Sequence, residues 1–355
     1  MKKIVLTGGG TAGHVTPNLA LLPSLEKAGF SVSYIGSYNG IEKTLAESKG
    51  LPYYGISSGK FRRYASAKNF TDIFRVLHGI SQARGLMKKI KPDIVFSKGG
   101  FVSVPVVLAA ASRGIPVVIH ESDMTPGLAN RIAMKKASKI CCTFPETLGY
   151  LPADKAVLTG APIREELLHG DKAAGLKFAG FTDDKPMLLV VGGSTGAAKV
   201  NEAVWEILPE LTQDFNVCHL TGKGKADKNL TGTPGYAQFE YVSDEMKDLL
   251  AACSLVVSRA GSNAICEFLA TRTPSVLIPL SAQASRGDQI LNAKSFQKQG
   301  FCEVLDEDTM KPQDVLDAVS KVYNNRETYI QAMEKSPATD AVGKITEILT
   351  GLANS

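Results

Sequence analysis

A histidine lies within a glycine-rich turn near the start of the chain. The stretch 8–17, GGGTAGHVTP, follows directly on an apolar run at 4–6. Backbone N–H groups in such a strand-to-helix turn suit a phosphate group, and an imidazole with an ordinary pKa of about 6.5 suits a general base at neutral pH. We therefore expect His14, with Thr11 beside it, to act as a base; the alternative is a histidine that only caps or packs the following helix.

The same turn matches the pattern G-x-G-x-x-G at Gly8, Gly10 and Gly13, which alone is a weak sign of a dinucleotide site. That site also needs an acid at the end of the second strand to hold a ribose. Here the position reads YIGSY, 34–38, with neither an acid nor an arginine, and no G-x-x-x-x-G-K-[ST] stretch occurs. The sequence thus argues against NAD, NADP and P-loop nucleotides, and it favours a diphosphate held by helix N-termini.

Two glycine turns in the second half add hydroxyl and carboxylate groups. The stretch 192–197, GGSTGA, carries Ser194 and Thr195, and the stretch 258–267, SRAGSNAICE, starts a helix near Gly261. Glu267 follows Asn263 by one helical turn, so its carboxylate could accept hydrogen bonds from two ribose hydroxyls. The alternative is an acid that is favoured there only by the helix dipole, and the local residues leave both interpretations open.

Short apolar runs alternate with helical stretches along the chain. Strands are expected at 4–6, 32–35, 93–96 and 116–119, and helices at 19–28 and 42–48. Such runs between helices are typical of a buried parallel sheet. Helical crossovers between parallel strands give a doubly wound α/β fold.

The pattern starts again in the second half. PMLLVVGGSTGAAKVNEAVW, from Pro186, repeats the opening strand, turn and helix, and SLVVSRAGSNAICEFLA (254–270) repeats DIVFSKGGFVSVPVVLAA (93–110). Both members of the second pair end a strand on Ser-Lys/Arg-x-Gly. We predict two Rossmann-like domains, 1–161 and 162–339, facing a central cleft at the carboxyl ends of their sheets, where ligands bind in such folds.

Composition is that of a globular protein: of 355 residues, 44% are hydrophobic and 21% charged. Only a short apolar run follows the basic start, so we expect no signal peptide. The longest apolar stretch, 104–111, is far too short to span a membrane. Six cysteines form no Cys-x-x-Cys pair, which favours reduced structural thiols over a zinc or redox site. We expect a cytoplasmic protein without a metal.

Positive charge is concentrated between residues 60 and 91. This segment holds nine lysines and arginines and one acid, Asp72, although the whole chain has a net charge of only +5, so an anionic partner is expected there. We propose a membrane surface, bound with salt-sensitive affinity; no motif indicates nucleic acid. For the apolar stripe alone, a core-facing helix is the favoured alternative. The stripe has helical spacing and comprises Phe70, Ile73, Phe74, Leu77, Ile80, Met87 and Ile90.

Seven motifs, in order, resemble the MurG family of cell-wall glycosyltransferases: GGGTAGHVTP, SKGGFVSVP, HESDMTPGLANR, LTGAPIR, GGSTGA, SRAGSNAICE and SRGDQILNA. The resemblance runs from residue 4 to about residue 293. It implies a GT-B fold with an N-terminal domain for lipid I, the undecaprenyl-pyrophosphoryl-muramyl pentapeptide, and a C-terminal domain for UDP-N-acetylglucosamine. It also implies that the last segment, 340–355, returns to the N-terminal domain, and that the enzyme acts peripherally at the cytoplasmic face of the membrane.

The resemblance implies a reaction and its residues. N-acetylglucosamine passes from UDP to the muramyl 4-hydroxyl with inversion, without a cofactor, and the product is lipid II. His14 is the base, Glu267 holds the ribose, the backbone at Val242 contacts uracil, and Arg164 neutralises the leaving UDP. Other donor contacts are Thr11, Ala12, Gly13, Ser194, Ser262, Asn263, Ala264, Asp288 and Gln289, and acceptor contacts are Gly10, Gly99, Gly100, Ser103 and Glu121.

Three positions depart from the family pattern. Ala12 replaces a glycine of the first turn. His120-Glu121-Ser122-Asp123 stands where the family has His-Glu-Gln-Asn, so that a carboxylate at Asp123 competes with His14 as the base. Asp288 replaces the first of two glutamines, which leaves the choice of donor sugar open.

Three other functions compete with this interpretation. Two are other UDP-sugar enzymes of the same fold, a glycolipid glycosyltransferase and a UDP-N-acetylglucosamine epimerase, and the third is a non-catalytic nucleotide-sugar-binding module. Conversion of the donor without an acceptor would distinguish the epimerase.

Overall fold

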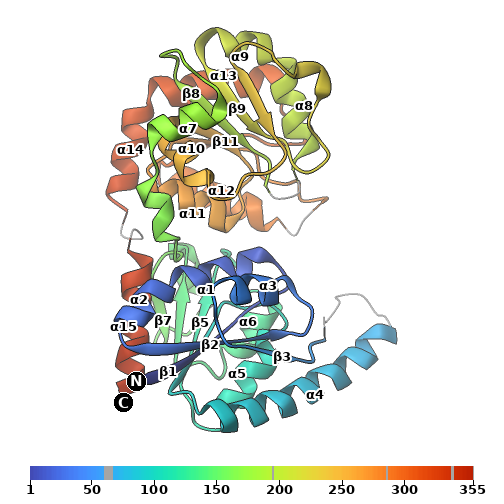
Figure 1. Cartoon of the computed structure of the whole chain (residues 1–355), viewed down its shortest axis with the longest axis vertical. Coiled ribbons are helices and arrows are strands. Elements are labelled where there is room, and N and C mark those ends of the chain that lie inside the picture. The colour runs from blue at the N-terminus through green and yellow to red at the C-terminus, as the bar shows by residue number, and fades with distance from the viewer. Residues whose placement is uncertain (60–66, 194–195, 285–286, 337–339, 355) are drawn as a thin grey trace. The chain divides into compact units, whose positions relative to one another are not determined.

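The structure is a computed structural model that describes residues 1–59, 67–193, 196–284, 287–336 and 340–354. The chain divides into two compact units: unit 1 is Met1–Arg164 with Asp340–Ser355, and unit 2 is Glu165–Thr339. Each unit is built on one parallel sheet with helices on its faces (Figure 1). The predicted α/β fold of two Rossmann-like domains is therefore confirmed.

The sheet of unit 1 has seven strands in the order β3-β2-β1-β4-β5-β6-β7. Their apolar residues are buried on both faces of the sheet, one face with Val5, Ile35 and Val95 and the other with Ile4, Leu6 and Phe96. The strands are β1 (Lys2–Thr7), β2 (Phe30–Ser37), β3 (Tyr53–Ile56), β4 (Ile94–Ser97), β5 (Val117–Glu121), β6 (Lys139–Cys142) and β7 (Ala156–Leu158). The helices are η1 (Ala12–His14), α1 (Thr16–Ala20), α2 (Leu22–Lys27), α3 (Ile41–Ser48), α4 (Ala67–Ile90), α5 (Ser103–Ala111), α6 (Leu128–Ala133), η2 (Pro145–Tyr150) and α15 (Ala341–Asn354).

The helix expected at 19–28 is wrong in its bounds, because two short helices, α1 and α2, meet at Leu21. Pro17 and Pro23 each stand in the first turn of their helix, where a missing N–H costs nothing. Pro23 has no N–H to donate to Leu19, so α1 cannot continue through it.

The C-terminal helix α15 packs on unit 1. Ile345 and Leu349 are fully buried in the cluster that contains Leu25 and Ile94, and Lys2 Nζ donates a 2.8 Å hydrogen bond to the carbonyl of Ala353. Figure 1 shows α15 beside α2. Unit 1 therefore combines both ends of the chain.

Unit 2 repeats the topology of unit 1. Its strand order, β10-β9-β8-β11-β12-β13, matches β3-β2-β1-β4-β5-β6 position by position. The strands are β8 (Met187–Val191), β9 (Asn216–Leu220), β10 (Tyr236–Phe239), β11 (Cys253–Ser258), β12 (Ser275–Leu277) and β13 (Cys302–Val304). The helices are η3 (Glu165–His169), α7 (Lys172–Ala179), α8 (Ala198–Glu206), α9 (Leu208–Asp214), η4 (Lys228–Leu230), α10 (Met246–Ala252), α11 (Ser262–Ala270), α12 (Asp288–Lys298), α13 (Pro312–Asn324) and α14 (Arg326–Glu334).

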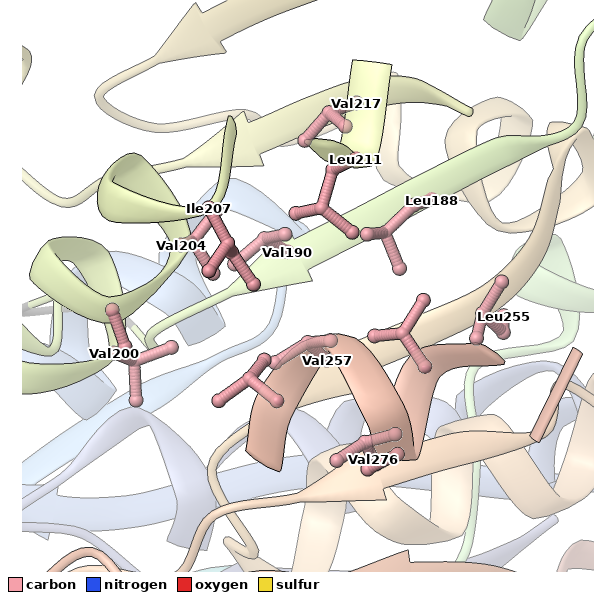
Figure 2. Packing of buried hydrophobic residues seen from close by; sticks show 14 of the residues in the cluster. Leu188, Val190, Val200, Val204, Ile207, Leu211, Val217, Leu255, Val257 and Val276 are labelled. Atoms are coloured by element: carbon pink, nitrogen blue, oxygen red, sulfur yellow. The ribbon is translucent and has the colours of Figure 1, made fainter. Parts of the chain in front are cut away.

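Aliphatic side chains from strands and helices form the core of unit 2. Figure 2 shows Val190 of β8 beside Val204 and Ile207, which follow the glycine turn after β8, and Leu188 of the same strand beside Leu211. Burial of such side chains stabilises each by about 1.5–3 kcal/mol. This core fixes the strand ends from which the turns of unit 2 project.

The predicted apolar stripe on the long helix α4 is buried toward the end of the helix and exposed nearer its start. Met87 and Ile90 are buried, as the core-facing alternative expected, whereas Phe74 and Leu77 are 60% and 57% exposed. Residues 60–66, with Lys60, Arg62 and Arg63, and the side chains of Lys68, Phe70 and Ile73 lie outside the described part of the chain.

The cysteines are free thiols, and five of the six are buried, which agrees with the structural role expected of them. Across the described ranges, no group of histidine, cysteine and carboxylate side chains could hold a metal ion. No helix in those same ranges combines the length and apolarity needed to cross a membrane.

Candidate functional site

All the glycine turns singled out from the sequence follow the carboxyl end of a strand. In unit 1 they follow β1 and β4, and in unit 2 they follow β8 and β11. Strands β1 and β4 are neighbours, with Thr7 paired to Ser97, and β8 and β11 are neighbours, with Val191 paired to Ser258. Each unit therefore presents two glycine turns side by side at one edge of its sheet, where ligands bind in this kind of fold.

His14 ends the short helix η1 within the first turn. Its Nδ1 lies 3.0 Å from the hydroxyl oxygen of Thr11, and the ring is half-buried. Burial and the nearby Lys98 ammonium lower the pKa of His14 to about 4, and the carboxylate of Glu42 opposes this shift. The ring is therefore neutral at pH 7. If Nδ1–H donates to Thr11, the lone pair on Nε2 can accept a proton.

Glu42, on α3, holds the backbone of the first glycine turn. Its side chain is fully buried, and its carboxylate accepts hydrogen bonds from the N–H of Gly10 at 3.2 Å and from the N–H and hydroxyl of Ser37 at 3.0 and 2.5 Å. A Cβ on Gly9 or Gly36 would collide with this side chain. This carboxylate is therefore directed at the protein's own glycine turn.

Sequence reasoning missed Glu42, because the acid was sought at the strand end, 34–38, and it lies four residues further on. The glycines at 9, 36 and 40 were the available signal, since all three lie against this one carboxylate. A buried carboxylate is costly unless donors hydrogen-bond to it. Because the surrounding glycines have no side chains, backbone N–H groups come close enough to donate hydrogen bonds to this carboxylate.

The second turn of unit 1, after β4, touches the first. Gly99 and Gly100 have φ angles of 90° and 81°, which favour glycine, and a Cβ on Gly100 would collide with the carbonyl oxygen of Gly9. Ser103 begins α5 and donates to the carbonyl of Gly100 at 2.8 Å. The predicted acceptor contacts Gly10, Gly99, Gly100 and Ser103 are thus brought together.

A buried lysine links this second turn to the loop after β5. Lys98 is 1% exposed; its ammonium donates to Nδ1 of His120 at 2.7 Å and to the hydroxyl of Ser122. His120 in turn donates from Nε2 to the carbonyl of Gly160 at 2.8 Å. Burial and the ammonium lower the pKa of His120 well below its usual value, so its ring is neutral and accepts from the lysine.

Glu121 organises the loop that carries Asp123. Its buried carboxylate accepts from Asn130 Nδ2 at 2.8 Å and from the N–H groups of Gly127 and Asp123, each at 3.1 Å. Burial raises the pKa of Glu121, and these donors oppose the shift. Asp123 is half-buried and follows β5, as the turn of His14 follows β1, so both candidates for the base lie at the carboxyl edge of the unit 1 sheet. The roles predicted for Asp123 and Glu121 in catalysis and acceptor binding stay predictions.

In unit 2, the predicted donor contacts gather at the start of α11. Ser262, Asn263 and Ala264 form its first turn, and Glu267 follows one turn later, half-buried. The side chain of Val242 is 6% exposed, which suits a contact made through the backbone. Ser194 and Thr195 lie outside the residues that the structure describes.

Two further predicted donor contacts stand at the start of α12. Asp288 is its first residue, and the side-chain oxygen of Gln289 accepts the N–H of Leu280 at 3.0 Å. This bond fixes the amide, so that its NH₂ group is the end available to donate. Asn292 of the same helix donates to the carbonyl of Ala260 at 3.4 Å and thereby links α12 to the turn before α11. Arg164, a predicted phosphate contact, belongs to unit 1 as its last residue before unit 2 begins.

The turn after β11 is held by a buried ion pair that sequence reasoning also missed. Arg259 pairs with Glu307 and donates to the carbonyl of Ile278 at 3.0 Å, while Glu307 accepts the N–H of Ser281 at 3.0 Å. The partners are 48 residues apart, so only the fold brings them together. The pair fixes the start of the loop after β12, at Ser281.

A neutral chain of hydrogen bonds supports the turn after β9. Trp205 Nε1 donates to the Tyr236 hydroxyl at 2.9 Å, which lies 3.1 Å from Nδ1 of His219. His219 Nε2 lies 3.0 Å from Oδ1 of Asn201, whose amide donates to the carbonyl of Thr221 at 2.9 Å. Burial lowers the pKa of His219 to about 3. The imidazole is neutral, and its two nitrogens serve as acceptor and donor in a fixed order.

Comparison with known proteins places the chain in a class. The Glycosyltransferase family 28 N-terminal domain matches residues 4–142, and the C-terminal domain of the same family matches residues 187–347. The chain belongs to glycosyltransferase family 28 and has the GT-B fold of two parallel-sheet domains.

Its relatives are more specific. A protein of Lachnospira eligens named UDP-N-acetylglucosamine--N-acetylmuramyl-(pentapeptide) pyrophosphoryl-undecaprenol N-acetylglucosamine transferase is 69% identical over 98% of this chain and 99% of its own length. A protein of the same name from Lachnoclostridium phytofermentans is 58% identical over 98% of both chains. The crystal structure of MurG from Acinetobacter baumannii superposes with a TM-score of 0.76 at 26% identity, covering 99% of this chain and 100% of that one. The resemblance found in the seven motifs is confirmed.

Proposed function

We propose that this chain transfers N-acetylglucosamine from UDP-N-acetylglucosamine to the muramyl 4-hydroxyl of lipid I and so forms lipid II for peptidoglycan synthesis. The observation that carries this proposal is the similarity to the Lachnospira transferase over nearly the whole of both chains. The Thr11–His14 pair, set in a glycine turn at the carboxyl edge of a parallel sheet, supplies a base for such a transfer.

Unit 1 supplies the base and binds the acceptor in this proposal. His14 donates from Nδ1 to Thr11 and accepts the 4-hydroxyl proton at Nε2. The hydroxyl oxygen forms a bond to the anomeric carbon from the face opposite UDP as the bond to UDP breaks, so an α-linked donor gives a β-linked product. The anionic diphosphates of both substrates raise the pKa of His14 when they bind, which makes it a stronger base in the ternary complex.

Unit 2 binds the donor. The first turn of α11 directs backbone N–H groups at the diphosphate, where a helix N-terminus stabilises negative charge. Glu267 accepts from the ribose hydroxyls, and the NH₂ group of Gln289, oriented by its bond to Leu280, donates to a sugar hydroxyl. Arg164, the last residue of unit 1 before unit 2, neutralises charge on the departing UDP.

Release of UDP tests the proposal. The protein is supplied with UDP-N-acetylglucosamine, with and without a lipid I analogue, and in parallel with UDP-glucose. We expect release that requires both the lipid and the N-acetyl sugar. Donor conversion without an acceptor would indicate an epimerase, and a preference for UDP-glucose would indicate another glycolipid transferase; either result would overturn the proposal.

We also propose that unit 1 binds the cytoplasmic face of the membrane through the outer face of α4. Along this face, exposed residues recur at positions 74, 77, 78, 81, 84 and 88, which is helical spacing. The apolar side chains of Phe74 and Leu77 come first, and the basic Arg84 and Lys88 follow. Apolar side chains that enter the interface and cations that meet anionic lipid suit this arrangement.

Vesicle sedimentation tests the membrane proposal. We expect the protein to bind vesicles that contain phosphatidylglycerol, to bind phosphatidylcholine vesicles weakly, and to dissociate as salt rises. Phe74→Ser with Leu77→Ser should weaken binding, whereas Ile41→Ser, an exposed apolar residue on α3, serves as the matched control. Equal binding by both variants would place the membrane contact elsewhere.

A further inference from the structure

We propose that Lys98 is a positioning residue for the transfer. Its stem lies against the first glycine turn, and its buried ammonium holds the loop after β5 through His120 and Ser122 and places a positive charge near His14. The inference rests on the proposed role of His14 as the base.

Lys98 stands directly beside the turn that carries His14. Its backbone N–H donates to the carbonyl of Thr7 at 2.9 Å, so the end of β4 is fastened to the end of β1. A Cβ on Gly8 would lie 3.3 Å from Cβ of Lys98 and would collide with the carbonyl oxygen of His14. A single glycine therefore separates the stem of the lysine from the backbone of the histidine.

The ammonium itself reaches across to the next strand. It donates to Nδ1 of His120 at 2.7 Å and to the Ser122 hydroxyl, and β4 and β5 are hydrogen-bonded neighbours. One residue, through its backbone N–H and its side chain, thus links three neighbouring strand ends, those of β1, β4 and β5. The turn with His14 and the loop with Asp123 cannot move apart without breaking these bonds.

A buried positive charge at this place also acts on the imidazole. Protonation of His14 would put a second cation beside Lys98, which is unfavourable where few water molecules screen the charges. The opposing charge is Glu42, which approaches from α3 through Gly10. The other titratable groups near the ammonium are His120 on β5 and the buried Cys141 thiol on β6. Lys98 is thus the cation in this cluster that disfavours protonation of His14.

Histidine NMR tests this inference without reliance on activity. The chain has five histidines, so the signal of His14 can be assigned from its loss in His14→Gln. In the wild type we expect the His14 signal to keep its neutral position from pH 8 down to pH 5.5. In Lys98→Met the His14 midpoint should rise by about one unit. Ser122→Ala is the matched control, because it removes one contact of the ammonium and keeps the charge, and it should leave the midpoint unchanged.

Two further variants separate the charge of Lys98 from its effect on folding. Lys98→Gln keeps a donor for Nδ1 of His120 while it removes the charge, so it replaces Lys98→Met if that variant does not fold. Lys98→Arg keeps the charge and should keep the wild-type midpoint. The pH at which kcat/KM falls in acid should move upward in Lys98→Gln together with the His14 midpoint. An identical His14 titration in the wild type and in the uncharged variants would overturn the inference.

Failure of this inference and failure of the proposed function give different results. If His14→Ala retains wild-type turnover, His14 is not the base, whatever Lys98 does to its pKa. If His14→Ala is inactive but the titration midpoint of His14 is the same with and without the charge of Lys98, the proposed function is retained and the role of Lys98 is contradicted.

Discussion

Lys98 of unit 1 and Arg259 of unit 2 occupy the same place in two copies of one topology. Each follows the serine that ends the strand next to the first strand, and each donates its backbone N–H to the end of that first strand, to Thr7 at 2.9 Å and to Val191 at 3.4 Å. Each sends a cation toward the next strand end, fully buried in Lys98 and 11% exposed in Arg259. Lys98 meets an imidazole and a hydroxyl, whereas Arg259 meets two carbonyls and the carboxylate of Glu307.

In the proposed function, this difference distinguishes the sheet edge that carries the base from the sheet edge that binds the donor. An arginine paired with a buried carboxylate is held in a rigid planar fork and keeps its charge at all working pH values. A lysine that donates to an imidazole couples its charge to groups that can exchange protons. The repeat in unit 1 therefore suits proton transfer at His14, and the repeat in unit 2 suits a fixed framework for the donor.

The largest effect expected from this comparison is on turnover, through the proposed base His14. Because the base is unique to the unit 1 edge in this account, His14→Ala should lower turnover by about 10²–10⁴-fold. His169→Ala, which removes an exposed histidine of η3 in unit 2, is the control and should retain activity. Near wild-type turnover in His14→Ala would transfer the role of base to another residue, with Asp123 the first candidate.

The framework role of Arg259 predicts a loss of stability. Glu307→Gln leaves the guanidinium buried without its counter-charge, which typically costs about 3–5 kcal/mol. Urea unfolding measures this change, and Lys199→Gln, which breaks the exposed pair with Asp308, should cost less than about 1 kcal/mol. A loss of similar size in both variants would show that the pair does not hold the unit 2 edge.

Acid should destabilise the chain through its buried neutral histidines. The pKa of His219 is about 3 and that of His14 about 4 in the folded chain, against about 6.5 when unfolded. These lowered values mean that the unfolded state binds protons first, so their contribution is fully present above about pH 6.5 and declines as pH falls toward 3. His219→Gln should reduce the loss in unfolding free energy between pH 7 and pH 5. If the unfolding free energy of His219→Gln falls between pH 7 and pH 5 as much as that of the wild type, the lowered pKa assigned to His219 is contradicted.

The smallest effect concerns the orientation of the base. Thr11→Val removes the hydroxyl that meets Nδ1 of His14, and we expect about a tenfold loss in kcat, the equivalent of one hydrogen bond. Thr16→Val is the matched control, because Thr16 donates only to the carbonyl of Ala12 at 3.1 Å among the contacts described for it. Equal losses in both variants would mean that Thr11 acts on the turn and not on the imidazole.

Much of the fold could be predicted from the sequence. The strand runs and glycine turns are local signals, and the repeat of Ser-Lys/Arg-x-Gly correctly indicated two copies of one topology. The groups that hold the turns could not be predicted, since Glu42 meets Gly10 across 32 residues and Arg259 meets Glu307 across 48. Lys98 was visible as part of a motif, but its contact with His120 depends on the pairing of β4 with β5.

The measurement that tests the central claim most directly is UDP binding by calorimetry to His14→Ala and Glu267→Ala, beside the wild type. If unit 1 supplies the base and unit 2 holds the donor, His14→Ala binds UDP with the wild-type Kd. Glu267→Ala should bind at least about tenfold more weakly, since it loses charge-assisted hydrogen bonds to the ribose. Weakened binding in His14→Ala, or an unchanged Kd in Glu267→Ala, would contradict this division of work between the two units.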